Sequence, residues 1–136
     1  MKTFILFVFV ATALLAGCKK EKALPQSLIG KWEERHVSGG QAQVPNTSPN
    51  TKAGNGYIIE FSETGFQRSQ NGEITSQGTY KLMKDSVNID GTIYNDALLF
   101  NNESLKRYVK VSGNKLMISI GSIAFDGMTV TYQRLR

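Results

Sequence analysis

The sequence is poor in the residues that build metal centres, disulfide scaffolds and nucleophilic active sites. Its 136 residues include one cysteine, one histidine and one tryptophan. A single cysteine excludes a disulfide scaffold. After the N-terminal segment there is no long hydrophobic run, which excludes a protein with several membrane-spanning helices. Since a domain usually takes about 100–200 residues, the length also excludes a multidomain enzyme.

The candidate catalytic residues do not form a recognisable set. His36 is the only histidine, and Glu33 and Glu34 precede it at positions that face opposite sides of a strand. We expect a solvated strand end there and no metal site, because a metal needs three or four converging ligands. No serine–histidine–acid set and no pair of acidic catalytic residues can be assigned. The sequence therefore predicts a protein that is not an enzyme and has no cofactor.

The chain is basic, with a formal net charge of +5. A basic protein can bind nucleic acid or an anionic surface. Here the positive charge is spread along the chain, apart from residues 19–22 and 106–110. In the second group Lys106 and Lys110 share one face of a strand and Arg107 takes the other, which is typical of a solvated barrel wall. We expect no nucleic-acid partner.

Residues 1–17 differ in kind from the rest of the chain. Lys2 is followed by an apolar run over residues 4–16, which as a helix would extend about 20 Å. That length is short of a ~30 Å hydrocarbon core, so a cleaved signal peptide is favoured over a permanent membrane helix. A plain signal peptide followed by a free cysteine remains the alternative.

The end of this run, Leu15-Ala16-Gly17-Cys18, resembles the bacterial lipobox. The resemblance implies that Cys18 becomes the new N-terminus, carries acyl chains such as palmitate, and anchors an envelope lipoprotein of a Gram-negative bacterium. Several acyl chains give a stable anchor where one is marginal. Residues 18–26 then read as the lipidated cysteine and its tether. Because the tether is mainly basic, we expect the periplasmic side of the outer membrane rather than surface display.

From residue 27 onward the hydrophobic pattern alternates with period two, which predicts β-strands. Asn71-Gly72, Asp90-Gly91 and Asp126-Gly127 are typical turn pairs between strands. Residues 92–100 could be a strand or a helical turn, and residues 38–55 form a long loop. We expect strands at residues 28–37, 57–61, 66–70, 74–83, 87–89, 105–111, 116–120 and 128–134.

These eight or nine short strands, joined by hairpin turns, predict an all-β domain over residues 27–136. An antiparallel up-and-down β-barrel of about eight strands is favoured because closure removes the exposed edge strands. A two-sheet sandwich with Greek-key connections is the alternative. Eight strands leave an interior that side chains fill or that holds one small ligand.

Gly30-Lys31-Trp32 in the first strand and Arg134 in the last resemble the pattern of the lipocalin or calycin family. With the lipobox and the short tether, the layout is similar to small bacterial lipocalin-like lipoproteins. The resemblance implies that Trp32 packs against Arg134 at one end of the barrel. The Thr-Asp-Tyr turn of larger lipocalins is absent, so a small or filled cavity is expected.

Strand alternation predicts which side chains face the barrel interior. From these we take Tyr57, Ile59, Phe61, Phe66, Tyr80 and Tyr132 as candidates for the lining of a ligand cavity. The tyrosines could instead bond to backbone or water at the rim. The full predicted inward set is Tyr57, Ile59, Phe61, Phe66, Ile74, Tyr80, Leu82, Val87, Ile89, Val109, Val111, Leu116, Ile118, Ile120, Val130 and Tyr132.

Two functions are consistent with this pattern. The first is non-catalytic binding of a small, largely apolar ligand inside the barrel, with the membrane as partner through the anchor at Cys18. The second is an interaction or inhibitor module with a filled barrel, which would use the loop at residues 38–55 to meet an envelope protein or polymer. A continuous cavity favours the first function, and a solid core favours the second.

Overall fold

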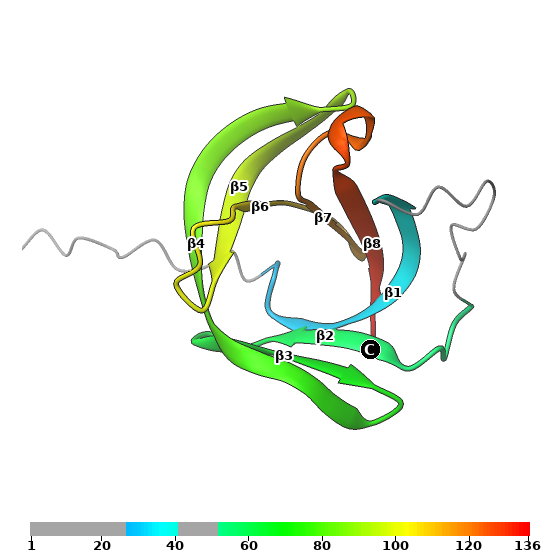
Figure 1. Ribbon diagram of the computed structural model, residues 1–136. Coiled ribbons are helices and arrows are strands. Elements are labelled where there is room, and N and C mark those ends of the chain that lie inside the picture. Colours follow the sequence, from blue (N-terminus) through cyan, green and yellow to red (C-terminus); the bar gives the residue numbers. More distant parts are fainter. Residues whose placement is uncertain (1–26, 41–51) are drawn as a thin grey trace, which may run out of the picture.

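Eight antiparallel strands form a closed ring (Figure 1). The computed structural model describes residues 27–40 and 52–136. Each strand pairs with the next, and the last pairs with the first, so the predicted all-β, up-and-down order is confirmed. The elements are β1 (Gly30–Gly39), β2 (Tyr57–Phe61), β3 (Gly65–Gln70), β4 (Glu73–Ile89), β5 (Thr92–Phe100), β6 (Arg107–Ser112), β7 (Lys115–Ser119), a 3-10 turn η1 (Ile123–Phe125) and β8 (Met128–Arg134).

Several of the predicted features lie outside the described residues. They are the apolar run and Cys18, the tether up to residue 26, and residues 41–51 of the predicted loop. Within the described ranges, no helix has the length and apolar character needed to cross a membrane. The predicted loop begins later than expected, because β1 continues through Gly39.

The ring consists of two parts that share β1 and β4. The first half of β4, Glu73 to Thr79, pairs with β3, while Tyr80 to Ile89 pairs with β5. In the same way β1 pairs with β2 near Gly30 and with β8 toward Gly39. Each shared strand passes from one part to the other, and Figure 1 shows the long curve of β4 along one side of the ring. The two parts enclose the hydrophobic core.

The predicted strands at 74–83 and 87–89 are one 17-residue strand, β4. The inward positions change phase between the two predicted strands, from even numbers such as Leu82 to odd numbers such as Val87. The structure keeps the strand continuous through an irregularity between Lys84 and Val87 in the pairing with β5. One extra residue in a strand reverses the side on which the following residues lie. Residues 92–100 form strand β5, which settles the number of strands at eight.

Three members of the predicted inward set are exposed. Ile74 is 57% exposed, because the register shifts between Arg68 and Ser69 and a bulge in β4 turns it outward. Tyr57 is 42% exposed at the first position of β2. Ile120 lies one residue beyond the end of β7, where the chain leaves the sheet.

Two of the three predicted turn pairs adopt the backbone conformations that tight hairpins need, whereas Asp126, with φ of 59°, ends η1 and Gly127 has no positive φ. Asn71 and Gly72 have φ of 52° and 87°, and Asp90 and Gly91 have φ of 49° and 80°. Positive φ at two successive positions is the requirement of a type I′ turn. Asp90 has a second role, because its carboxylate accepts hydrogen bonds from Ser122 Oγ at 2.7 Å and from the amide of Ile123 at 3.0 Å. These bonds hold the β4–β5 turn against η1.

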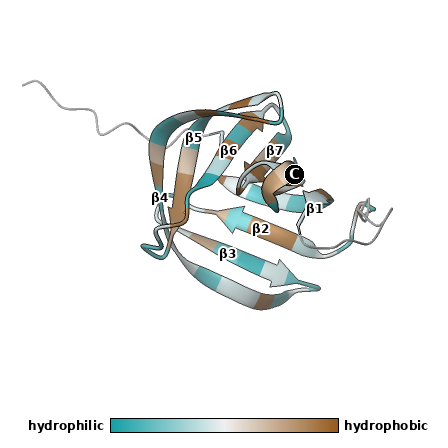
Figure 2. Ribbon diagram, turned by 45° about the horizontal axis from the view of Figure 1, so that its top comes forward, coloured by the Kyte–Doolittle hydropathy of each residue, from teal (hydrophilic) through white to brown (hydrophobic). Residues whose placement is uncertain are grey.

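Aromatic side chains fill the space between the two parts of the ring. The Phe66 and Phe100 rings meet edge to face with centroids 4.4 Å apart, and Phe61 meets Tyr80 in the same way at 5.3 Å. Edge-to-face pairs at such distances add to the stability gained from burial. Figure 2 shows hydrophobic and hydrophilic bands alternating along the strands, as expected for walls with one dry face. The buried cluster contains Leu28, Trp32, Ile59, Phe61, Phe66, Leu98, Phe100, Val109, Leu116 and Ile118.

Trp32 and Arg134 close one end of this core. The two residues are register partners on β1 and β8, and the Arg134 guanidinium carbon lies 4.0 Å from the centre of the Trp32 ring. Trp32 is fully buried, and its indole N–H donates a hydrogen bond to the Leu28 carbonyl at 2.8 Å. A Cβ at position 30 would lie 2.7 Å from Arg134 Nη1, so Gly30 leaves the space that the guanidinium occupies.

Glu33 does not lie at a solvated strand end as the sequence suggested. It is 2% exposed, and its Oε2 lies 2.6 Å from Arg35 Nη2. Buried carboxylates are costly unless paired, and Arg35 supplies the opposite charge. Glu33 is thus part of a structural ion pair on β1.

Candidate functional site

A cavity of about 170 Å³ lies where strands β1, β2, β3, β4 and β8 converge. It is bounded by side chains from both parts of the ring, beside the packed aromatic core. Its lining combines apolar residues such as Ile59 with polar and charged groups, which is the usual composition of a small-molecule site. We call this cavity the mouth pocket. It is lined by Glu34, Tyr57, Ile58, Ile59, Arg68, Ser69, Gln70, Thr75 and Tyr132.

Two acidic groups of the mouth pocket are shifted toward their neutral forms. Burial raises the pKa of the Glu34 carboxyl above its ordinary value of 4.5. Burial also raises the pKa of the Tyr132 phenol to about 12, with the nearby charge of Glu34 adding to the shift and the charge of Arg68 opposing it. Removal of water disfavours charged forms in this way. Tyr132 therefore presents a protonated hydroxyl, a hydrogen-bond donor, to the pocket at neutral pH.

Arg68 is the cationic group of the mouth pocket. Its guanidinium carbon lies 5.2 Å from the centre of the Phe66 ring and 5.0 Å from that of Phe100. Such cation–π contacts hold a guanidinium against aromatic faces while its N–H groups stay available. In the described part of the chain, Arg68 forms no ion pair with a carboxylate.

Hydrogen bonds hold the rim of the mouth pocket. Asn55 Nδ2 donates to the Glu34 carbonyl at 2.7 Å, and Asn55 Oδ1 accepts from the Tyr57 amide at 2.8 Å. These bonds tie the segment that enters β2 to the middle of β1. Gln70 Nε2 donates to the Tyr57 hydroxyl at 2.9 Å across β2 and β3. The end of the predicted 38–55 loop is thereby fixed beside the pocket.

The six cavity candidates from the sequence divide into two groups. Tyr57, Ile59 and Tyr132 line the mouth pocket. Phe61, Phe66 and Tyr80 belong to the aromatic core or pack against it. The Tyr80 hydroxyl donates to the Ser62 carbonyl at 2.6 Å and is used within the fold.

The sequence reasoning missed the two charged residues of the pocket. The alternation of side chains along a strand would have predicted that both residues face inward. Glu34 follows the inward Trp32 by two positions, and Arg68 follows the inward Phe66 by two. Both were passed over because the inward set was chosen from apolar and tyrosine residues.

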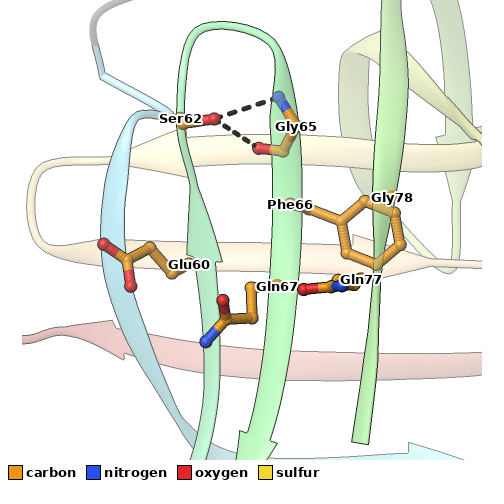
Figure 3. Close-up of a pocket in the computed structure, with 7 residues that line it drawn as sticks. All are labelled: Glu60, Ser62, Gly65, Phe66, Gln67, Gln77 and Gly78. Carbon is orange, nitrogen blue, oxygen red and sulfur yellow. Dashed lines mark hydrogen bonds between the residues drawn. The ribbon is translucent and has the colours of Figure 1, made fainter. Parts of the chain in front are cut away.

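A second, shallower hollow of about 480 Å³ lies across β2, β3 and β4 (Figure 3). Glu60, Gln67 and Gln77 are register neighbours and form a row across the three strands. Ser62 Oγ exchanges hydrogen bonds with the backbone of Gly65 at 3.0 Å, so this end of the hollow is occupied by turn contacts. The hollow is wide and polar, and no charged group in it lacks a partner, since Glu60 lies 3.5 Å from Lys31 Nζ.

Metal ligands do not gather in the described ranges: no group of three or more His, Cys, Asp or Glu residues could hold an ion. The mouth pocket offers the cation of Arg68, the carboxyl of Glu34, the phenols of Tyr57 and Tyr132, and apolar surface from Ile59. Such groups can bind and orient a small molecule.

Comparisons with family models, with curated proteins and with solved structures found no match. The class that the fold defines is an eight-stranded antiparallel β ring, and the mouth pocket lies between its strands β1, β2, β3, β4 and β8.

Proposed function

We propose that the protein is a non-catalytic envelope lipoprotein that binds a small, largely apolar molecule in the mouth pocket. Lipidation of Cys18 anchors it in the outer membrane, with the barrel on the periplasmic side. The proposal combines the resemblance of residues 15–18 to a lipobox with the resemblance of the barrel to lipocalin-like lipoproteins. An anchored carrier would stay where apolar molecules enter and leave the membrane.

The observation that carries the binding proposal is the mouth pocket itself. Its volume of about 170 Å³ limits the ligand to a compact molecule. The apolar side chain of Ile59 favours an apolar body, and Arg68 and Tyr132 provide polar contacts that fix its orientation.

One observation favours a second function, an interaction module for an envelope protein or polymer. Phe61, Phe66, Phe100 and their neighbours fill much of the ring interior, and the other cavity there, beside Leu28, Leu82 and Val109, has only about 80 Å³ and leaves no room for a long ligand. Most of the loop that would meet such a partner lies outside the described residues.

Native mass spectrometry of the full-length protein, extracted from its own membrane, tests the proposal. We expect an extra mass that is lost on denaturation. Thr75→Trp should remove it, because Thr75 lines the pocket and an indole would fill the space. Gln77→Trp is the matched control, two residues along β4 in the outer hollow, and should retain it. If neither the wild type nor either variant shows an extra mass, ligand binding is contradicted and the interaction module is favoured.

A further inference from the structure

We propose that the mouth pocket is selective for a small monocarboxylate, whose carboxylate pairs with the Arg68 guanidinium and whose apolar body lies against Ile59. This inference rests on the proposed binding function and names the chemical class of its ligand. The supporting observation is a difference between the contacts of Arg68 and those of the other arginines on the strands.

The three other arginines on the strands each have a hydrogen-bond or ion-pair acceptor within the protein. Arg35 pairs with Glu33 at 2.6 Å, and Arg107 pairs with Glu103 at 2.9 Å. Arg134 Nη1 donates to the Ile29 carbonyl at 2.7 Å. Arg68 is half-buried against two aromatic rings, and a guanidinium positioned in this way can bind an anion through charge-assisted hydrogen bonds. Arg68 has no ion-pair partner among the described carboxylates and lines a cavity, so an anionic ligand would supply the missing partner.

The geometry of the guanidinium favours a carboxylate. Its planar fork presents parallel N–H groups that match two carboxylate oxygens. The rings of Phe66 and Phe100 hold the group in place, so less conformational freedom is lost when the ligand binds. Tyr132 adds a neutral hydroxyl donor to the lining of the same cavity.

The charge of the pocket limits the ligand to a single negative charge. Glu34 lines the same cavity and acts on Tyr132 as a negative charge. A phosphate monoester or a dicarboxylate would bring a second negative charge into the small cavity that Glu34 lines, and like charges in one cavity disfavour each other. One carboxylate balances Arg68 and leaves the rest of the ligand apolar.

Isothermal titration calorimetry of the full-length protein with benzoate tests this inference. Benzyl alcohol and benzylamine, its neutral and cationic counterparts of similar size, are titrated in parallel. We expect benzoate to bind the wild type at least about tenfold more tightly than either counterpart, as charged hydrogen bonds are worth about 1.5–3 kcal/mol. This comparison uses only the wild-type protein, so it does not depend on any variant folding.

Two variants locate the effect. Arg68→Gln should weaken benzoate binding at least about tenfold and leave benzyl alcohol unchanged, while Arg68→Lys should restore part of the loss. Arg107→Gln is the matched control, because Arg107 also lies 5.0 Å from the Phe100 ring but does not line the pocket. It should leave benzoate binding unchanged.

The outcomes separate the two proposals. If benzoate and benzyl alcohol bind equally and Arg68→Gln changes neither, carboxylate selectivity is wrong and the binding pocket stands. If inorganic phosphate displaces benzoate more strongly than acetate does, the monoanion preference is wrong. If none of the three aromatic probes binds at millimolar concentration, both the selectivity and the proposed binding function are contradicted.

Discussion

Arg134 lies over the ring of Trp32, with its guanidinium carbon 4.0 Å from the ring centre, and joins the last strand to the first. The two residues come from opposite ends of the described chain, and their contact is made where the ring closes. Arg134 also donates to the carbonyls of Ile29 and Ser27, and so holds the segment that enters β1. One side chain therefore connects the indole, the entering chain and the closing strand.

Replacing Arg134 should destabilise the barrel. Arg134→Met loses the cation–π contact and the charged hydrogen bonds to backbone, and we expect a cost of about 2–3 kcal/mol. Arg136→Met, at an exposed position two residues on, should change the free energy of unfolding by less than about 0.5 kcal/mol. Urea unfolding at neutral pH measures both. Equal losses in the two variants would contradict the role of Arg134 in closing the ring.

Ile59 and Ile74 show that a residue's place in the alternating strand pattern does not by itself predict whether its side chain is buried. Both were predicted to face inward, yet Ile59 is 1% exposed and Ile74 is 57% exposed. Ile59→Ala should cost about 2–5 kcal/mol because it opens a cavity in the core. Ile74→Ala should stay within about 0.5 kcal/mol, as for other surface positions. Thermal unfolding of the two variants gives the comparison, and a large loss at Ile74 would show that the β4 bulge is misplaced.

The phenol of Tyr132 should make stability fall at high pH. Its pKa is about 12 in the folded protein against an ordinary value of 10.0, so the folded state holds its proton more tightly. Stability from this group is complete below pH 10 and is lost as the pH rises toward 12, on the order of 2 kcal/mol in all. In the Tyr132→Phe variant, this loss of folding stability at high pH should be absent. Denaturant unfolding at pH 8 and at pH 11 measures it, with Tyr57→Phe at the exposed rim as control; identical profiles for wild type and Tyr132→Phe would contradict burial of the phenol.

The proposed lipidation of Cys18 predicts that this residue holds the protein in the membrane. Cys18→Ala removes the acylated thiol, and we expect the protein to move from the membrane fraction to the periplasmic fraction. Cys18→Ser is a second variant with nearly the same shape and the same expected result. Fractionation and immunoblotting give the readout. Retention of both variants in the membrane would contradict lipidation as the anchor.

The local rules of the sequence predicted most of the strands and turns correctly. Asn71-Gly72 and Asp90-Gly91 form their turns because a two-residue hairpin needs positive φ, which these residues tolerate. The division of β4 into two strands was wrong, because a phase change can mean either a turn or a bulge. Only pairing with β5 distinguishes them, since the partner strand continues past the irregularity.

By itself, the sequence determined the all-β class, the order of the strands and the chemical contrast between residues 1–26 and the rest. These follow from period, turn chemistry and composition, which are local properties of the chain. The tertiary structure alone decided which inward residues line a cavity and which fill the core. Phe66 and Arg68 lie two positions apart on one strand, yet one is buried among aromatic rings and the other lines the mouth pocket. The difference depends on the distance between the two parts of the ring at each position along the strand. Packing across the ring sets that distance, and no local sequence pattern encodes it.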